Sequence, residues 1–342
     1  MSLTRGKEIN YKRNNYKDVG RSSPLVSILI PVYNRVNLIE QCVDSAINQD
    51  YDSFEIIIVD NNSSDGTFEL CISKYSNKVK VYQNEKNIGP VQNWKKCIEY
   101  ASGEYSKILF SDDSISSNYL TETMKLMNDH IGFVFSSAFI GKNKNSAQLN
   151  YKWNIEKINS DKYIEYSLLK PGALLSPGAA IFRTFDLREC FVSNIPNFNS
   201  KGFSYYGAGP DLLLFLNIAN KYEFVCHCNS TSVFFREHSG SATTKAHRLK
   251  QWPIRSCYNM ARSWFATDYI KKNIIISKLA ARIIVTELIE NKDITLLMYK
   301  KNHKFLRQYF QNEKIYMHIY YPYMCLFVYD AIKYYLWKKF KG

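Results

Sequence analysis

Short apolar runs alternate with helical patterns in the first third of the chain. Four runs rich in β-branched and aromatic residues are expected to form strands, at residues 25–30, 54–60, 79–82 and 105–110. Between them, apolar residues recur on one helix face, which predicts helices over 36–48, 66–75 and 90–101. Strands that alternate with helices indicate an α/β fold with a mostly parallel sheet flanked by helices. Pro31 is expected to end the first strand.

Three polar clusters follow these predicted strands: Pro31–Asn34, Asp60 and Asp112–Asp113. Ligands of parallel sheets bind at the carboxyl ends of the strands, so a shared site is expected there. Two adjacent carboxylates at a strand exit repel each other, and a divalent cation that carries a diphosphate relieves that repulsion. The alternative is an ordinary turn, in which Asp is a common residue.

Two common nucleotide-binding motifs are absent from the chain. No Gly-x-Gly-x-x-Gly follows the first predicted strand, which argues against a dinucleotide-dependent dehydrogenase. The Gly-x-x-x-x-Gly-Lys-Ser/Thr pattern of a P-loop does not occur either. The polar strand ends therefore indicate another kind of nucleotide site.

The ordered motifs of residues 24 to about 240 resemble those of family-2 inverting glycosyltransferases with the GT-A fold, of the bacterial surface-polysaccharide type. The matching segments are Ser27–Asn34, Ile57–Thr67, Asn87–Gly89 with Asn93, and Asp112–Asp113. The resemblance implies a GT-A domain with a nucleotide-sugar donor, expected to be a UDP-sugar. It also implies a glycan or lipid-linked glycan acceptor.

The resemblance also implies roles for individual residues. Asp60 is expected to accept a hydrogen bond from the uracil imide, which suits an acceptor-only carboxylate. Asp112 and Asp113 are expected to hold Mn²⁺ or Mg²⁺. One departure concerns Phe110, which occupies the place of the first acidic residue in the family's metal motif. The expected donor-binding residues are Pro31, Tyr33, Asn34, Asp60, Asn87, Gly89, Asn93, Asp112 and Arg236.

Three later segments carry the remaining candidates. Residues 171–183 resemble the family's acceptor-facing segment, or form an ordinary Gly/Pro turn. Asp211 resembles the family's general base, although a charge in the first turn of a helix is the simpler explanation. His238, in a polar loop after the last predicted strand, is expected to complete the metal site or contact the diphosphate. Arg236 is expected to be a further phosphate contact.

Charge divides the chain into three parts. Residues 1–23 carry six Lys and Arg against two Asp and Glu, residues 24–252 are neutral, and residues 253–342 carry sixteen against six. We expect a basic flexible leader (1–23), a catalytic domain (24–250) and a basic, aromatic helical extension (251–342). The aromatic and lysine-rich stretch 316–341 suits an anionic membrane surface, and the alternative is a packed helix or an oligomer contact.

Cysteine spacing and the start of the chain indicate the cellular location and the partners to expect. The eight cysteines are scattered and lack the spacing of a zinc site, so buried free thiols are expected. The polar, basic start lacks a secretory signal, which favours the cytoplasm and a peripheral place at the inner face of the membrane. No nucleic-acid module is recognisable, and oligomeric state is left open. The competing hypothesis is a non-catalytic nucleotide-sugar-binding module with a degenerate metal site.

Overall fold

The computed structural model describes residues 23–150, 155–170, 176–195, 203, 207–241, 253–270, 273–291 and 320. It divides into two compact units. The sheet unit comprises Ile9–Tyr163 and Leu174–Cys257, and the helical unit comprises Met1–Glu8, Ile164–Ala173 and Tyr258–Gly342. The predicted boundary after residue 250 falls within residues 242–252, outside the described residues.

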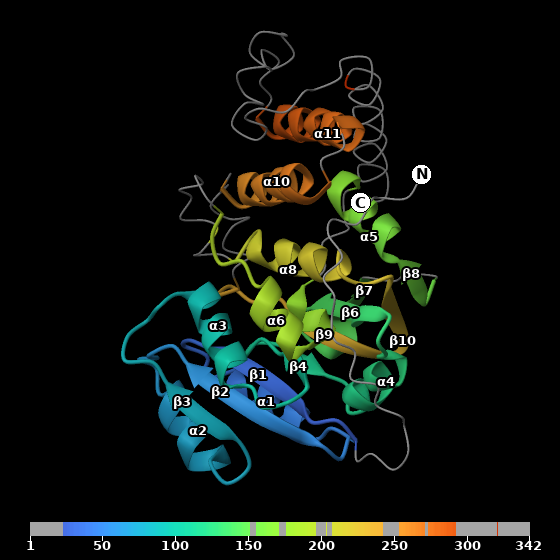
Figure 1. Ribbon diagram of the computed structural model, residues 1–342. Coiled ribbons are helices and arrows are strands. Elements are labelled where there is room, and N and C mark those ends of the chain that lie inside the picture. Colours follow the sequence, from blue (N-terminus) through green and yellow to red (C-terminus); the bar gives the residue numbers. More distant parts are fainter. Residues whose placement is uncertain are drawn as a thin grey trace. The chain divides into compact units, whose positions relative to one another are not determined.

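The predicted alternation of strands and helices forms the first part of the sheet unit (Figure 1). Its elements are β1 (Val26–Val32), α1 (Ile39–Ile47), β2 (Phe54–Asp60), α2 (Thr67–Tyr75), β3 (Lys80–Gln83), α3 (Pro90–Tyr100) and β4 (Tyr105–Ile108). All seven predicted elements are present, with bounds within a few residues of those expected. In Figure 1, α2 and α3 lie on opposite sides of this part of the sheet.

The second part of the chain is more irregular. Its strands are β5 (Ser114–Ile115), β6 (Ile131–Gly141), β7 (Gln148–Asn150), β8 (Lys157–Asn159), β9 (Ala180–Arg183) and β10 (Phe224–Arg236). Its α-helices are α4 (Tyr119–Leu126), α5 (Ser160–Leu169), α6 (Thr184–Cys190), α8 (Pro210–Ala219), α10 (Pro253–Phe265) and α11 (Asn273–Asn291). The shorter turns are η1 (Lys144–Ser146), η2 (Pro177–Ala179) and the π-helix η3 (Ala266–Ile270).

One mixed sheet joins the strands of the described residues, in the order β3-β2-β1-β4-β9-β6-β10-β5. The pairs β2–β3, β1–β2, β1–β4 and β6–β10 are parallel, whereas β9 and β5 run antiparallel to their neighbours. β7 pairs with β6, and β8 pairs with β10. The sheet is therefore mostly parallel at the β1–β4 end, where the predicted site residues lie.

The structure differs from the prediction at Pro31, because β1 continues to Val32. The carbonyl of Leu29 accepts from Leu109 on the β4 side, and the carbonyl of Val32 accepts from Asn61 on the β2 side. In a central strand, the backbone groups of successive residues point alternately to the two neighbouring strands. The backbone nitrogen of Pro31 therefore faces the β4 side, where β4 has already ended. Its missing N–H therefore costs no ladder hydrogen bond, and a proline is tolerated in this strand.

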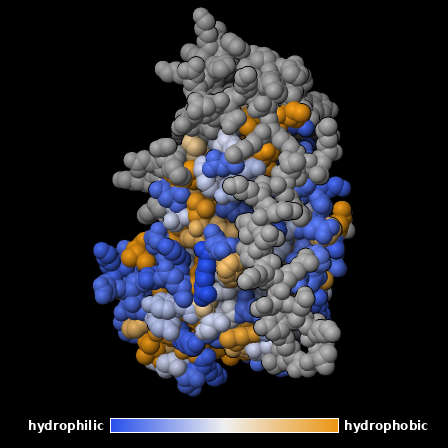
Figure 2. All heavy atoms as spheres, viewed as in Figure 1, coloured by the Kyte–Doolittle hydropathy of each residue, from blue (hydrophilic) through white to orange (hydrophobic). Residues whose placement is uncertain are grey.

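The core of the sheet unit follows from the periodicities of the sequence. All seven residues of β1 are buried, as expected of a central parallel strand. α1 buries Ile39, Cys42, Val43 and Ala46, which lie on one face of the helix. Hydrophilic residues predominate on the surface around α2 and α3 in Figure 2, where the chain faces water.

The helical unit is held together by two buried arginines. Arg262 of α10 donates to the carbonyl of Ser167 at 3.1 Å, and Arg282 of α11 donates to the carbonyl of Leu168 at 2.7 Å. Both carbonyls lie in the last turn of α5, where backbone acceptors lack partners within the helix. Among the described helices, none is both long and apolar enough to cross a lipid bilayer.

Candidate active site

Three strand ends meet at one edge of the sheet unit. β1 lies between β2 and β4, and all three run in the same direction. Val32 at the end of β1 is in register with Asp60 at the end of β2. The segment that follows β4 carries Asp112 and Asp113, so the predicted polar clusters are brought to one edge. This placement follows from the parallel topology.

Asp112 lies among basic side chains. Its Oδ2 is 2.9 Å from Nε2 of His238 and 3.7 Å from Nε of Arg35. Burial disfavours the charged carboxylate, but the hydrogen bond with His238 and the charge of Arg35 outweigh it. The pKa of Asp112 consequently lies below its ordinary value, and the side chain is ionised at neutral pH.

Asp113 has a different environment. Its side chain is buried, and Oδ1 accepts a hydrogen bond of 3.0 Å from the backbone N–H of Arg236. Burial and the adjacent charge of Asp112 raise the pKa of Asp113. The two carboxylates are therefore not equivalent: Asp112 offers a charge, whereas Asp113 ties the segment after β4 to the end of β10.

A fully buried lysine lies behind this pair. Lys107 of β4 donates to the carbonyl of Gly178, and its Nζ lies 4.5 Å from the ring centroid of Tyr119. Burial lowers the pKa of Lys107 to about 7, and the charge of Asp113 opposes that shift. The cation is thus close to losing its proton at neutral pH, and only Asp113 among the nearby carboxylates favours its charged form.

The predicted metal ligands are brought together in part. Asp112 and His238 are in direct contact, whereas Asp113 accepts a hydrogen bond from the backbone of Arg236. Within the described ranges, no group of three or more His, Cys, Asp or Glu side chains is arranged to hold a metal ion. One carboxylate and one imidazole nevertheless suit a cation that takes its other ligands from substrate phosphates.

Arg35 borders Asp112 and Arg236 borders Asp113, and only Arg236 was predicted from the sequence. Arg35 donates to the carbonyls of Tyr33 and Asn34, and the guanidinium of Arg236 donates to Gln41 of α1. The Nε atoms of both arginines are buried without a hydrogen-bond partner among the described residues. The signal for Arg35 was its place directly after the Pro31–Asn34 motif.

Asp60 is completely buried at the end of β2. Its carboxylate accepts from the backbone and hydroxyl of Ser63, at 2.8 and 2.5 Å, and from Gln83 at 3.2 Å. An imide donor would share a carboxylate that already accepts three hydrogen bonds. A carboxylate offers about four acceptor sites, so a fourth donor is compatible with these contacts, and the expected contact with uracil remains a prediction.

The loop after β1 interlocks with the loop after β2. Asn34 has a positive φ of 49°, and its Oδ1 accepts from the backbone of Ser64 at 2.9 Å. In return, the backbone N–H of Asn34 donates to Ser63 at 2.9 Å. Tyr33 is 42% exposed, so its ring is available to a ligand at this edge.

A set of asparagines fixes the segment between β3 and α3. Asn61 donates to Asn87 at 2.9 Å and accepts from Asn84 at 3.0 Å. Asn93 accepts from Asn84 at 2.8 Å and donates to the carbonyl of Val59 at 3.0 Å. Asn87 and Asn93 were predicted as donor-binding residues. Both side-chain amides are hydrogen-bonded within the protein, so they stabilise the loop that ends at Gly89.

Asp211 lies in the first turn of α8, as its sequence pattern predicts. Its Oδ1 accepts from the backbone of Gly209 at 2.8 Å and of Leu212 at 2.7 Å, which orients the carboxylate. The preceding Gly207, at a φ of 69°, lies so close to Trp94 that a Cβ atom would clash with the ring. Trp94 also packs on Phe110, with ring centroids 5.3 Å apart.

The first part of α8 is thus linked through Trp94 to the segment that carries Asp112. Phe110 occupies the position of an acidic residue of the family motif, and its ring packs against Trp94 instead. It also lies against Gly178 of η2, where an added Cβ would be 3.0 Å from the Phe110 ring. Of the expected acceptor segment 171–183, residues 171–175 lie outside the described residues, and the remainder forms η2 and β9.

The cysteines fit the expectation of buried thiols within the described residues. Seven free cysteines are buried, and Cys325 lies outside the described residues. Cys226 and Cys228 belong to β10, which packs into the core. Burial raises the pKa of Cys226 to about 11, so its thiol is protonated at neutral pH.

Comparison with known proteins matches this region to glycosyltransferases. Residues 27–191 match the model of the family described as Glycosyl transferase family 2. The GalNAc(5)-diNAcBac-PP-undecaprenol beta-1,3-glucosyltransferase of Campylobacter jejuni is 34% identical over 125 residues, which cover 36% of this chain and 40% of that protein. Glycosyltransferase GlyG of Streptococcus pneumoniae is 35% identical over 100 residues, which cover 29% of this chain and 33% of that protein.

A solved structure extends the similarity beyond the matched segment. A fragment of S. aureus TarS in complex with UDP-GlcNAc superposes with a TM-score of 0.58 at 18% identity, covering 82% of this chain and 78% of the fragment. At this identity the match shows the fold. The expected GT-A fold, with a helical C-terminal part, is confirmed. The chain spans less than half the length of the two curated relatives, whose similarity supports a glycosyltransferase.

Proposed function

We propose that this chain is an inverting glycosyltransferase that moves a sugar from a UDP-sugar to a hydroxyl group of a glycan or lipid-linked glycan. The observation that carries the proposal is the contact of Asp112 with His238 at 2.9 Å, with Arg35 beside Asp112 and the backbone of Arg236 bonded to the adjacent Asp113. These groups come from segments far apart in the sequence and meet at the ligand-binding edge of the sheet. The UDP-GlcNAc complex of TarS and the lipid-linked name of the Campylobacter relative support the donor and acceptor classes.

The chemistry assigned to these residues is a single displacement. The carboxylate of Asp211 accepts the proton of the acceptor hydroxyl as its oxygen bonds to the anomeric carbon. The bond from that carbon to the diphosphate breaks, and the diphosphate leaves with the electron pair, so the configuration inverts. Arg35 and Arg236 stabilise the leaving negative charge.

A divalent cation fits the same arrangement. Asp112 and His238 would hold Mn²⁺ or Mg²⁺, and the cation supplies further neutralisation of the leaving diphosphate. Oδ2 of Asp112 and Nε2 of His238 lie 2.9 Å apart, and the cation would replace the hydrogen bond that now joins them. Because the protein offers few ligands, we expect the cation to bind tightly only together with the nucleotide.

The test is donor turnover by the purified full chain, with and without Mn²⁺, across a panel of UDP-sugars. We expect wild-type protein to release UDP and the Asp112→Asn variant to lose at least 90% of this activity. The fold should persist in the variant, since one of two neighbouring charges is removed. Asp129→Asn, at an exposed position, is the control and should keep full activity. Equal activity in wild-type protein and Asp112→Asn would overturn the assignment of the site.

A second candidate function is a non-catalytic module that binds nucleotide sugars. Phe110 at the acidic position of the family motif and the small number of metal ligands favour it. Thermal shift measured beside turnover separates the two functions, because a bound ligand stabilises the folded state. A melting temperature that rises with UDP, together with no turnover of any donor or acceptor, would identify a binding module.

A further inference from the structure

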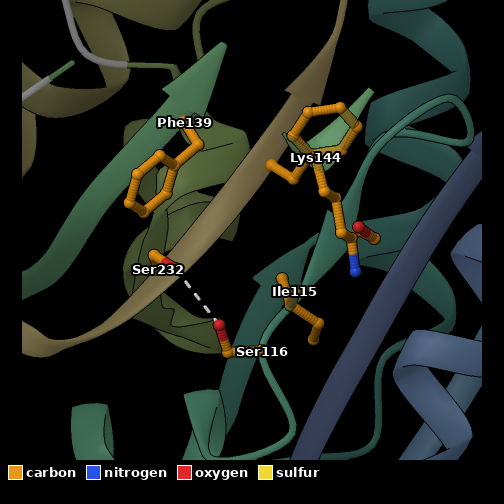
Figure 3. A pocket seen from close by; sticks show the side chains of 7 residues that line it. Ile115, Ser116, Phe139, Lys144 and Ser232 are labelled. Atoms are coloured by element: carbon orange, nitrogen blue, oxygen red, sulfur yellow. Dashed lines mark hydrogen bonds between the residues drawn. The ribbon is translucent and has the colours of Figure 1, made fainter. Parts of the chain in front are cut away.

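A pocket of about 190 Å³ lies on one face of strands β5, β6 and β10, within the sheet unit (Figure 3). It is separate from the groups assigned to the donor and to the metal. In Figure 3, Phe139 and Lys144 stand on opposite sides, with the hydrogen-bonded pair Ser116 and Ser232 below them. The residues that line it are Ser114, Ile115, Ser116, Phe139, Lys144, Ser232 and Phe234.

The strand register explains why these side chains share a face. Phe234 of β10 is paired with Ser114 of β5 on one side and with Phe139 of β6 on the other. Phe139 is in turn opposite Leu149 of β7. Residues in register project to the same face of a sheet, so four strands contribute one continuous row. Phe139 and Leu149 are 37% and 46% exposed, which leaves apolar surface at the rim of the pocket.

Two polar groups of the pocket have no partner among the described residues. Ser114 is only 2% exposed, and its buried hydroxyl has no hydrogen-bond partner among the described residues. An unpaired buried hydroxyl costs free energy unless a ligand satisfies it. Lys144 contributes a cation that no ion pair within the described residues neutralises.

The turn that carries Lys144 has a well-defined backbone. Oδ1 of Asn143 accepts from the backbone of Ser146 at 3.0 Å and so closes the short turn η1. Gly141, just before it, lies against Ala147 so closely that a Cβ atom would be 2.7 Å from the Ala147 Cα. Lys144 is exposed, so its side chain extends from this turn over the rim of the pocket.

The pocket adjoins the candidate active site. Ser114 directly follows Asp113, and the backbone of Arg236, two residues after Phe234, donates to Asp113. The guanidinium carbon of Arg236 is 5.9 Å from the ring centroid of Phe234. Two residues that line the pocket, Ser114 and Phe234, thus lie one and two positions along the chain from Asp113 and Arg236.

We propose that this pocket binds one pyranose unit that carries an acidic group and belongs to the acceptor glycan. A volume of about 190 Å³ favours a ligand the size of one sugar unit over a whole nucleotide. The serine hydroxyls pair with sugar hydroxyls, Phe139 contacts the apolar face of the ring, and Lys144 pairs with the acidic group. The identification of the sugar as an acceptor unit rests on the proposed function, whereas the binding itself does not.

Binding of single sugars to the full chain tests this proposal by ligand-observed NMR. Glucuronate and glucose 6-phosphate should each bind about fivefold more tightly than neutral glucose at low salt. This is the gain in affinity expected from one partly exposed ion pair with Lys144. Lys144→Gln should abolish that preference, and Lys142→Gln, an exposed lysine of the same segment, should keep it. A preference for the carboxylate or for the phosphate identifies the acidic group.

Ser114→Ala separates binding from packing. It removes a buried hydroxyl without a partner, so the melting temperature should hold or rise while the affinity for both acidic sugars falls severalfold. A lower melting temperature with unchanged affinity would show a purely structural serine and overturn the site. Equal binding of all three sugars, or of none, would also overturn it.

Binding of UDP, followed in the same samples by thermal shift, distinguishes the two proposals. Stabilisation by UDP without binding of acidic sugars leaves the donor site standing and refutes the pocket. Binding of acidic sugars that depends on Lys144, without any effect of UDP, supports the pocket and refutes the proposed function.

Discussion

At the residue scale, the surrounding groups give the adjacent carboxylates of Asp112 and Asp113 different pKa values and different roles. His238 and Arg35 favour the charged form of Asp112, whereas burial and the charge of Asp112 disfavour that of Asp113. One carboxylate is therefore suited to a cation or a substrate, and the other anchors Arg236 through its backbone. Two aspartates have the same ordinary pKa, so the difference between them comes from their surroundings.

Asp211→Asn tests the proposed base at the same scale. The amide retains an oxygen that can accept from Gly209 and Leu212, so the start of α8 should remain intact. It cannot accept the acceptor proton, so kcat should fall by about 10²–10⁴, the range typical of general acid–base catalysis. Steady-state kinetics and the melting temperature are the measurements.

Asp211→Ala is the companion variant, because it removes both the proposed base and the two hydrogen bonds that its carboxylate accepts from the backbone. It should lose about as much kcat as Asp211→Asn and in addition melt at a lower temperature. An Asp211→Asn protein that melts early but turns over normally per folded molecule would assign Asp211 to structure alone.

At the scale of elements, Glu55 of β2 ties three segments together. Its carboxylate accepts from Ser27 of β1 at 2.5 Å, from Lys80 of β3 at 2.7 Å and from Ser102 at 2.7 Å. Burial alone would raise the pKa of Glu55, but these hydrogen bonds outweigh it and lower the pKa. The charged carboxylate is thus part of the arrangement of β1, β2 and β3.

Glu55→Gln should destabilise the sheet unit by about 1–2 kcal/mol at pH 7, since charge-assisted hydrogen bonds are lost. The native pKa lies below the unfolded value of 4.5, so the stability from ionisation is full above that pH. It is lost as the pH falls through the native pKa. Denaturant unfolding of both proteins from pH 7 to pH 3 should show the difference shrinking.

Glu99→Gln is the control for this series, because Glu99 forms only an exposed ion pair with Lys96 of the same helix. It should change stability little at any pH. A Glu55→Gln penalty that stays constant down to pH 3 would show that packing, and not ionisation, explains the effect.

At the scale of the whole molecule, the excess of positive charge lies outside the central region of the sequence. The leader 1–23 carries a net charge of +4 and residues 253–342 carry +10, while residues 24–252 are neutral. The stretch 316–341 lies outside the described residues except for Tyr320, so its membrane contact stays a prediction. We propose a peripheral place at the cytoplasmic face of the membrane, where such a charge distribution is attracted to anionic lipid.

Replacing four lysines of the tail tests this location. Each lysine near an anionic surface contributes about 1 kcal/mol, so the change to glutamine should release the protein from anionic vesicles. Transfer to a short soluble acceptor should be unaffected, and vesicle sedimentation at several salt concentrations is the measurement. The positions are Lys333, Lys338, Lys339 and Lys341.

The matched control removes the same charge from exposed positions of the sheet unit, and it should leave vesicle binding unchanged. Its positions are Lys78, Lys86, Lys95 and Lys142. Wild-type protein that ignores anionic vesicles at low salt would refute the membrane proposal. Tight binding to RNA under those conditions would point to a nucleic-acid partner instead.

The sequence by itself determined the alternation of strands and helices up to β4 and the polar ends of those strands. Local periodicity fixes such elements, and parallel topology then places Asp60 and Asp112 at one edge. It also marked Pro31 as the end of β1. That prediction was wrong, because a proline is excluded from a strand only where its N–H would face a partner.

Only the tertiary structure decided which groups surround these side chains. His238 reaches Asp112 across 126 positions of sequence, and Arg35 reaches it across the sheet edge. The row of Leu149, Phe139, Phe234 and Ser114 exists because β5 and β6 pair with β10, which no local pattern specifies. Periodicity depends on neighbours along the chain, whereas charge, burial and pockets depend on neighbours in space. The fold and the strand-end motifs were therefore readable from the sequence, and the environment of each site residue was not.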